Sequence, residues 1–265
     1  MSETPVVLDV DAGVATLTLN RPDARNPLTT ELSAALRDHL DDLTERDDVR
    51  CVVLRGAGPA FSAGGDIKAM RERLDGDGSL DDAVHRLERT TNETIASLVT
   101  CPYPTVALVD GPAVGAGANL AIACDVQLGS ESASVGFVFR QVGLSVDAGT
   151  SYLLPRIVGE NVAKELVYTG EILDADRALD LGLLNHVYPD DDFEDEAAAF
   201  VERVADGPTV AFRHAKRLIR EGLDKSLQSA MTDEATAQGL VFETDDHREG
   251  VEAFLEQRDP DFDGR

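Results

Sequence analysis

The sequence predicts an α/β fold in which a core at residues 1–195 is followed by a helical region at residues 196–265. Two observations support this fold class. Strand-like runs twice lead through a helical segment into another strand-like run, which is the pattern of βαβ units. Beyond Gly159 the chain carries successive helical segments, and no Gly/Ser-rich linker interrupts it. We therefore expect one domain with a helical C-terminal part.

The first unit occupies residues 6–54. Two β-rich runs, 6–10 and 14–19, flank Asp11-Ala12-Gly13, whose turn chemistry predicts a hairpin. Leucines then recur at helical spacing over residues 30–44, which indicates an amphipathic helix. The unbroken apolar run 51–54 predicts a strand that is covered on both faces.

The second unit begins with the strand-like run 105–109. It passes through Gly111-Pro112 into a helix of small residues and ends in the strand-like run 125–128. Five helices are expected in the chain that follows, at residues 161–169, 174–181, 193–205, 210–223 and 243–257.

The charge balance excludes one class of partner. Against 24 basic residues stand 50 acidic ones, a formal net charge of -26, which repels the phosphates of nucleic acids. Salt would screen the self-repulsion of such a surface. The excess therefore favours a halophilic source, with an ordinary acidic protein as the alternative.

Metal-ligand and targeting patterns are missing from the sequence. Three cysteines and five histidines show no metal spacing, so we expect no metal, and the cysteines are interpreted as core residues. The acidic run 190–196 lacks the glycine and the ligand order of a calcium loop, and it is interpreted as a helix start. Neither a signal peptide nor an apolar stretch of membrane-spanning length is apparent, which predicts a soluble cytoplasmic protein without a membrane partner.

Two glycine-rich segments could carry chemistry. The segment 61–68 contains Gly64 and Gly65, which would let a backbone amide face a ligand without a Cβ in the way. The segment 111–120 runs into a helix, whose first amides could stabilise negative charge. Each segment also has a structural interpretation, a tight turn for the first and close helix packing for residues 115–118 in the second.

Together these segments resemble the crotonase superfamily, also called the enoyl-CoA hydratase/isomerase family, over nearly the whole chain. The early loop Asn20-Arg21-Pro22 with Asn26-Pro27-Leu28 and the terminal segment 242–256 match in the same order. The amino-acid sequence of residues 115–120 most resembles that of the phenylacetate-pathway epoxyphenylacetyl-CoA isomerases and the 3,2-enoyl-CoA isomerases. The resemblance implies a spiral core of repeated ββα units and a helical C-terminal region that forms a homotrimer or a hexamer.

The resemblance also implies a site for an acyl-CoA thioester. The amides of Gly65 and Ala116 would form an oxyanion hole, and coenzyme A would be part of the substrate, so that no separate cofactor is needed. The residues expected to bind coenzyme A or the acyl group are Ala24, Arg25, Ala63, Gly64, Asp66, Ile67, Asn119, Phe139 and Leu144.

The carboxylates distinguish the possible reactions. Hydratases of the family use two glutamates, and the matching positions here hold Asn119 and Phe139, neither of which can transfer a proton. The remaining candidate is Asp147, at a position where isomerases of the family carry a carboxylate. One carboxylate suffices to move a proton from one carbon to another.

Several alternatives stay open. Asp147 could be a helix N-cap, and the segment that begins there also resembles aryl-CoA dehalogenases, which need a histidine where this chain has Asn92; His85 lies two turns away. The preferred hypothesis is an enoyl-CoA or ring isomerase with Asp147, Gly65 and Ala116 as catalytic groups. The alternatives are an enoyl-CoA hydratase and a non-catalytic acyl-CoA-binding protein.

Overall fold

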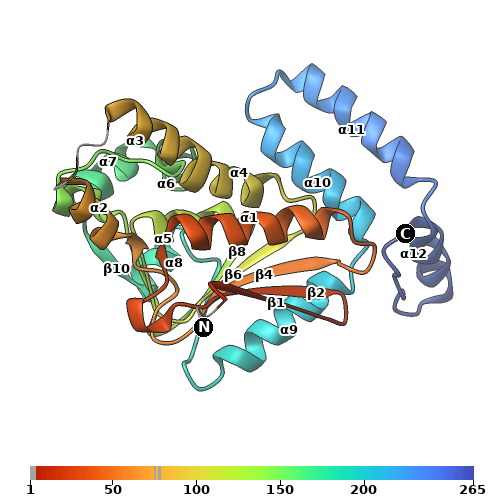
Figure 1. Cartoon of the computed structure of the whole chain (residues 1–265). Coiled ribbons are helices and arrows are strands. Elements are labelled where there is room, and N and C mark those ends of the chain that lie inside the picture. Colours follow the sequence, from red (N-terminus) through yellow and green to blue (C-terminus); the bar gives the residue numbers. More distant parts are fainter. Residues whose placement is uncertain (1–3, 75, 77–78) are drawn as a thin grey trace.

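The computed structural model describes residues 4–74, 76 and 79–265 and has the predicted α/β architecture. Its central sheet has six strands in the order β1-β2-β4-β6-β8-β11 (Figure 1). The pair β1–β2 is antiparallel and the other neighbours are parallel. These strands are β1 (Val6–Asp11), β2 (Val14–Leu19), β4 (Cys51–Gly56), β6 (Thr105–Val109), β8 (Val126–Ser130) and β11 (His186–Tyr188).

Two smaller sheets are formed by short strands in the segments that connect the strands of the central sheet. One has the order β10-β9-β7, and the other pairs β3 with β5 in parallel. Strands of two or three residues have no periodicity that a sequence pattern could reveal, and none of them was predicted. Their bounds are β3 (Pro27–Leu28), β5 (Gly64–Gly65), β7 (Pro112–Val114), β9 (Ser134–Gly136) and β10 (Ile172–Asp174).

The helical elements confirm the predicted helices to within two residues at each end. The α-helices are α1 (Thr30–Thr44), α2 (Ile67–Leu74), α3 (Leu80–Leu87), α4 (Glu93–Thr100), α5 (Ala116–Ala123), α6 (Thr150–Val158), α7 (Glu160–Thr169), α8 (Ala175–Asp180), α9 (Phe193–Ala205), α10 (Thr209–Gly222), α11 (Leu227–Val241) and α12 (Asp245–Glu256). Two 3₁₀ turns, η1 (Pro22–Ala24) and η3 (Val138–Val142), and one π-helical turn, η2 (Glu88–Asn92), complete the set.

Two helices in the chain after β8, α6 and α11, were not among the five expected there. Helix α6 contains Pro155, a residue that normally interrupts helices. Helix α11 buries only Ala237, so its apolar residues do not mark one face of a helix packed on a core. The local sequence pattern therefore did not reveal either helix.

Helices cover both faces of the central sheet, as the run 51–54 predicted. Val52 and Leu54 belong to the core that β4 shares with α1 and α4. Cys51 and Val53 instead pack with Phe193 and other residues of α9. All three cysteines are buried free thiols, and burial raises the pKa of Cys51 to about 12. Their interpretation as core residues is confirmed.

The C-terminal helices are attached to the core mainly through α10. The Lys216 ammonium lies 2.7 Å from the Asp125 carboxylate and donates to the Tyr103 carbonyl oxygen at 2.9 Å. Helices α11 and α12 continue along the margin of the molecule (Figure 1). The predicted division between residues 195 and 196 falls within α9, which packs on the sheet, and the division itself stays a prediction.

Candidate active site

The two glycine-rich segments lie against each other, although some 50 residues separate them in the chain. Ser62 and Ala113 form a parallel β-bridge. In it the Ser62 amide donates to the Pro112 carbonyl oxygen at 3.1 Å, and the Val114 amide donates to the Ser62 carbonyl oxygen at 3.0 Å. A Cβ at Gly64 would overlap the Val114 carbonyl oxygen and lie 3.1 Å from the Ala116 nitrogen. This close approach requires glycine at position 64.

Ala116 opens helix α5 directly after this contact. The preceding residue, Gly115, has φ +56° and ψ -126°, a conformation open mainly to glycine, and its amide donates to the Gly136 carbonyl at 2.7 Å. The first amides of a helix have no acceptor within the helix, so the Ala116 N–H is available to a ligand. Gly117 packs on Ser62, which shows that close packing is also part of this segment's role.

The early loop is tied to the first glycine segment by Asn26. This side chain is fully buried, and its Nδ2 donates to the carbonyl oxygens of Ala57 at 2.9 Å and Ala60 at 2.8 Å. The Ala63 amide donates to the Arg25 carbonyl at 2.7 Å. Asn26 was part of the quoted motif but was not among the predicted site residues. The backbone of Asn26 has a left-handed φ of +53°, and the hydrogen bonds of its side chain stabilise this conformation.

The other predicted coenzyme A residues gather on this same corner. Ala24 ends the turn η1, and Arg25 follows it with φ +61°; both are exposed. Asp66 accepts hydrogen bonds from the amides of Lys68 at 3.0 Å and Ala69 at 3.2 Å, so its side chain also caps α2. Ile67, the first residue of α2, is 59% exposed and is the apolar side chain open to a ligand here.

Asp147 lies in the loop between η3 and α6. It is half-buried, its Oδ1 atom is buried without a partner among the described residues, and burial raises the pKa of its carboxyl above the ordinary value. The residue that caps α6 is Gly149, so the N-cap interpretation of Asp147 is wrong. Ala148 has φ +49°, a left-handed conformation that costs a non-glycine residue about 1–2 kcal/mol. Such strain is common at functional sites.

Asn119 connects this loop to the second glycine segment. It lies one turn along α5 from Ala116, is completely buried, and its Nδ2 donates to the Asp147 carbonyl oxygen at 3.3 Å and to Thr150 Oγ1 at 2.7 Å. The carboxyl-bearing loop is thereby held beside the start of α5. Thr150 was missed by the sequence analysis, although the spacing Asp147-x-x-Thr150 is a local turn pattern that could have revealed it.

The remaining predicted site residues differ in accessibility. Phe139 is 7% exposed and packs in the core cluster that includes Ala116 and Ala148. Leu144 is 47% exposed, and its amide donates to the Phe139 carbonyl at 3.1 Å. A contact of these two residues with an acyl group stays a prediction.

The dehalogenase alternative finds no support from the facing helix. Asn92 and His85 are both exposed. The side chain that α4 presents to the Asp147 loop is Ile95, whose Cγ2 lies 3.3 Å from the position of a Cβ on Gly149. An alkyl group at this contact cannot take part in proton transfer.

The described residues hold neither a metal-ligand cluster nor a membrane-spanning helix. No group of three or more histidine, cysteine, aspartate or glutamate side chains there could hold a metal ion. None of the helices in residues 4–74, 76 and 79–265 is long and apolar enough to cross a membrane.

Comparison with known proteins gives the family. Residues 9–265 match the family model described as Enoyl-CoA hydratase/isomerase. A candidate enoyl-CoA hydratase of Thermus thermophilus is 40% identical over 257 residues, 97% of this chain and 100% of that protein. The 1,2-epoxyphenylacetyl-CoA isomerase of Escherichia coli is 34% identical over 260 residues, 98% of each chain.

A solved structure agrees with these matches. The enoyl-CoA hydratase of Bacillus anthracis has a TM-score of 0.91 to this chain at 33% identity, and the match covers 98% of this chain and 100% of that one. The protein is therefore an α/β enzyme of the crotonase fold, as predicted. The chain belongs to the enoyl-CoA hydratase/isomerase family.

Proposed function

We propose that this enzyme moves a double bond, or isomerises a ring, in an acyl-CoA thioester by proton transfer through Asp147. The observation that carries the proposal is the half-buried carboxyl of Asp147, in a loop that Asn119 holds beside the start of α5. The family resemblance places Asn119 and Phe139, which carry no carboxyl, at the positions of the two hydratase glutamates. Burial raises the pKa of Asp147, which makes its carboxylate a stronger base.

In a 3-enoyl-CoA the Asp147 carboxylate would take a proton from C2. The electron pair of that C–H bond moves toward the thioester carbonyl, and the oxygen becomes negative. The amides of Gly65 and Ala116 would stabilise this oxyanion, an arrangement in which each donor contributes about 3 kcal/mol. The protonated Asp147 then returns the proton to C4, and the double bond lies between C2 and C3.

The early loop and the first glycine segment would hold coenzyme A. Ala24, Arg25, Ala63, Gly64, Asp66 and Ile67 lie on one corner, which the bonds of Asn26 make rigid. Coenzyme A enters as part of the substrate, and we propose that no separate cofactor takes part. Asn119, Phe139 and Leu144 would border the acyl group.

The proposal is tested by assaying two reactions on the same enzyme preparation. Isomerisation of 3-enoyl-CoA is expected to exceed hydration of crotonyl-CoA by at least about 10²-fold in kcat/KM, because one carboxyl cannot both activate a water and protonate the product with the efficiency of a pair. Efficient hydration that survives Asp147→Asn would overturn the assignment. Binding without turnover over a broad acyl-CoA panel would instead favour a non-catalytic protein.

Hydration is the second candidate function. It is favoured by the relatives from Thermus thermophilus and Bacillus anthracis, whose names describe enoyl-CoA hydratases. In this chain a hydratase would have to activate its water without carboxylates at positions 119 and 139. The same pair of assays decides between the two candidates.

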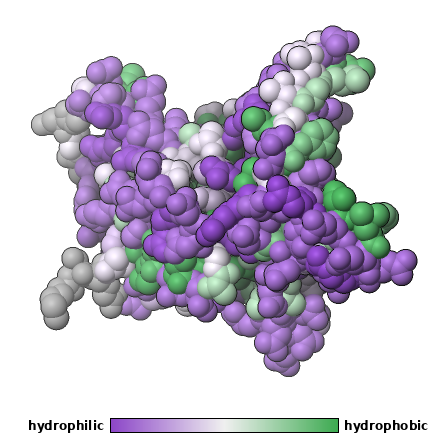
Figure 2. Space-filling view, turned by 90° about the vertical axis from the view of Figure 1, so that its right-hand side faces the viewer, coloured by the Kyte–Doolittle hydropathy of each residue, from purple (hydrophilic) through white to green (hydrophobic). Residues whose placement is uncertain are grey.

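We also propose that the C-terminal helices assemble the chain into a homotrimer or a hexamer. Figure 2 views their side of the molecule and shows apolar groups within a largely polar surface. Large apolar side chains exposed on these helices and their connections are Ile219, Leu223, Leu227, Met231, Leu240, Phe242, Val251, Phe254 and Leu255. Burying them against other copies would remove apolar area from water.

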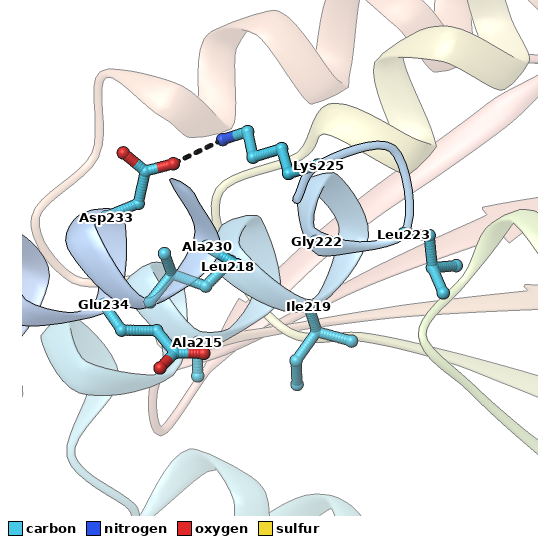
Figure 3. Close-up of a pocket in the computed structure, with 9 residues that line it drawn as sticks. All are labelled: Ala215, Leu218, Ile219, Gly222, Leu223, Lys225, Ala230, Asp233 and Glu234. Carbon is cyan, nitrogen blue, oxygen red and sulfur yellow. Dashed lines mark hydrogen bonds and ion pairs between the residues drawn. The ribbon is translucent and has the colours of Figure 1, made fainter. Parts of the chain in front are cut away.

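A crevice between α10 and α11 belongs to the same surface (Figure 3). Its volume is about 360 Å³, and Lys225 pairs with Asp233 across it at 2.7 Å. It is lined by Ala215, Leu218, Ile219, Gly222, Leu223, Lys225, Ala230, Asp233 and Glu234. None of the predicted catalytic or binding residues is among them, so the crevice is separate from the candidate active site.

Sedimentation equilibrium measures the proposed assembly. With a 28.4 kDa subunit, the expected mass is that of three or six copies. A variant with Leu223→Asp and Phe254→Asp should shift the mass toward the single subunit, because charge on an apolar interface is strongly unfavourable. A wild-type enzyme that sediments as a monomer would contradict the proposal.

A further inference from the structure

The loop that carries Asp147 is held by hydrogen bonds to its main chain rather than to its carboxyl. Three donors meet at the Asp147 carbonyl oxygen: the Thr150 amide at 2.9 Å, the Thr150 hydroxyl at 2.7 Å and Asn119 Nδ2 at 3.3 Å. Asn119 Nδ2 also donates to Thr150 Oγ1 at 2.7 Å. Within the described part of the chain, no hydrogen bond reaches either carboxyl oxygen of Asp147.

This arrangement differs from the usual behaviour of an aspartate before a helix. An aspartate three residues before a free amide commonly accepts that amide with its side chain. Here the Thr150 amide donates to the main-chain carbonyl instead. Ala148 and Gly149, with φ of +49° and +76°, turn the chain between them. The carboxyl of Asp147 therefore does not accept the amide at the start of α6.

The number of hydrogens on each group determines which group donates and which accepts in these hydrogen bonds. The Thr150 hydroxyl uses its one hydrogen for the Asp147 carbonyl, so it can only accept from Asn119. Asn119 must therefore present its NH₂ group, which leaves its Oδ1 buried without a partner among the described residues. Both side chains are buried, Asn119 at 0% and Thr150 at 1% exposure. A buried acceptor without a partner lowers the stability of the fold, so the other interactions of the fold must offset the free-energy cost of this geometry.

We propose that Thr150 and Asn119 are positioning residues, which direct three donors onto the main chain of Asp147 and so keep its carboxyl free to exchange a proton with the substrate. The inference rests on the proposed function, in which Asp147 is the acid/base. Neither residue needs to touch the reacting carbons. Their effect on turnover would arise through the orientation of one carboxyl.

The test compares substitutions at Thr150 that keep or remove the hydroxyl. Thr150→Val keeps the shape but lacks the hydroxyl, and Thr150→Ser keeps the hydroxyl but lacks the methyl. For isomerisation of 3-enoyl-CoA, we expect Thr150→Val to lower kcat by about 10²-fold with KM within about twofold, since misplacement of a catalytic group by about 1 Å has effects of this size. Thr150→Ser should stay within about threefold of wild type.

A second measurement follows the proton directly. In D₂O the enzyme should exchange the C2 hydrogens of the substrate, and Thr150→Val should slow this exchange in parallel with kcat. A purely structural role would lower the melting temperature and leave kcat per folded enzyme and the exchange rate unchanged, which would overturn the inference. If Thr150→Val does not fold, Thr150→Ala, which cannot overpack the site, carries the same expectation.

The variant Asp147→Asn separates this inference from the proposed function. If it retains isomerisation and exchange, the proposed function has failed, and the inference fails with it. If it abolishes both while Thr150→Val keeps wild-type kcat, only the positioning role is overturned.

Discussion

Replacing Asp147 with Asn is expected to lower kcat for 3-enoyl-CoA isomerisation by about 10³-fold, within the range that general acid–base groups contribute. Asparagine has nearly the same shape and can bind in the same loop, but it cannot accept and return a proton. KM should change little, because binding of coenzyme A is proposed for a different corner of the site. The measurement is steady-state kinetics on purified enzyme.

Asp110 provides a matched control for this substitution. It is another half-buried aspartate whose Oδ1 lacks a partner among the described residues, and burial raises the pKa of its carboxyl too. Its charged partner, Arg55, lies 3.6 Å away, and it has no proposed part in turnover. Asp110→Asn should therefore keep wild-type kcat. Equal losses in the two variants would contradict a specific role for Asp147.

The same substitution has an expected effect on stability. The folded-state pKa of Asp147 is raised, so the ionised carboxyl opposes folding once the pH exceeds that pKa, and this penalty is absent below the unfolded value near 3.8. Asp147→Asn should melt at a higher temperature than wild type at pH 7.5. The difference should shrink as the pH falls into the range where Asp147 binds a proton. A mutant less stable than wild type at neutral pH would contradict this account.

Removing the Ala116 amide is expected to lower kcat by about 10²–10³-fold, because one oxyanion donor contributes about 3 kcal/mol. Proline lacks the N–H, and the first position of a helix is where it is tolerated best. Ala116 occupies this position in α5, and the preceding residue, Gly115, has no Cβ that could clash with a proline ring. Ala116→Pro should therefore delete the donor while the helix is kept.

Ala175→Pro is the matched control for this experiment. Ala175 is likewise a buried alanine at the first position of a helix, α8, and the preceding Asp174 has the extended φ of -71° and ψ of 174° that proline requires. It is not among the residues of the candidate active site. Circular dichroism should show both variants folded, with kcat lost only in Ala116→Pro. Wild-type turnover in a folded Ala116→Pro enzyme would exclude this amide as an oxyanion donor.

Local sequence patterns predicted much of the fold. Helix α1 has the predicted bounds, since four leucines at helical spacing define its buried face. The hairpin and the strands β4 and β6 followed from turn chemistry and from unbroken apolar runs. The halophilic source and the cytoplasmic location stay predictions, because they concern the surroundings of the protein rather than its internal contacts.

The sequence by itself determined the family, the two glycine-rich segments and the single candidate carboxyl, because each is a property of residue order and type. Only the tertiary structure decided that Asp147 does not cap α6, and that Asn119 holds its main chain. The tertiary structure also decided that Gly64 contacts Val114. These contacts join residues up to 50 positions apart, so they depend on how the sheets and helices pack and leave no periodic pattern in the sequence.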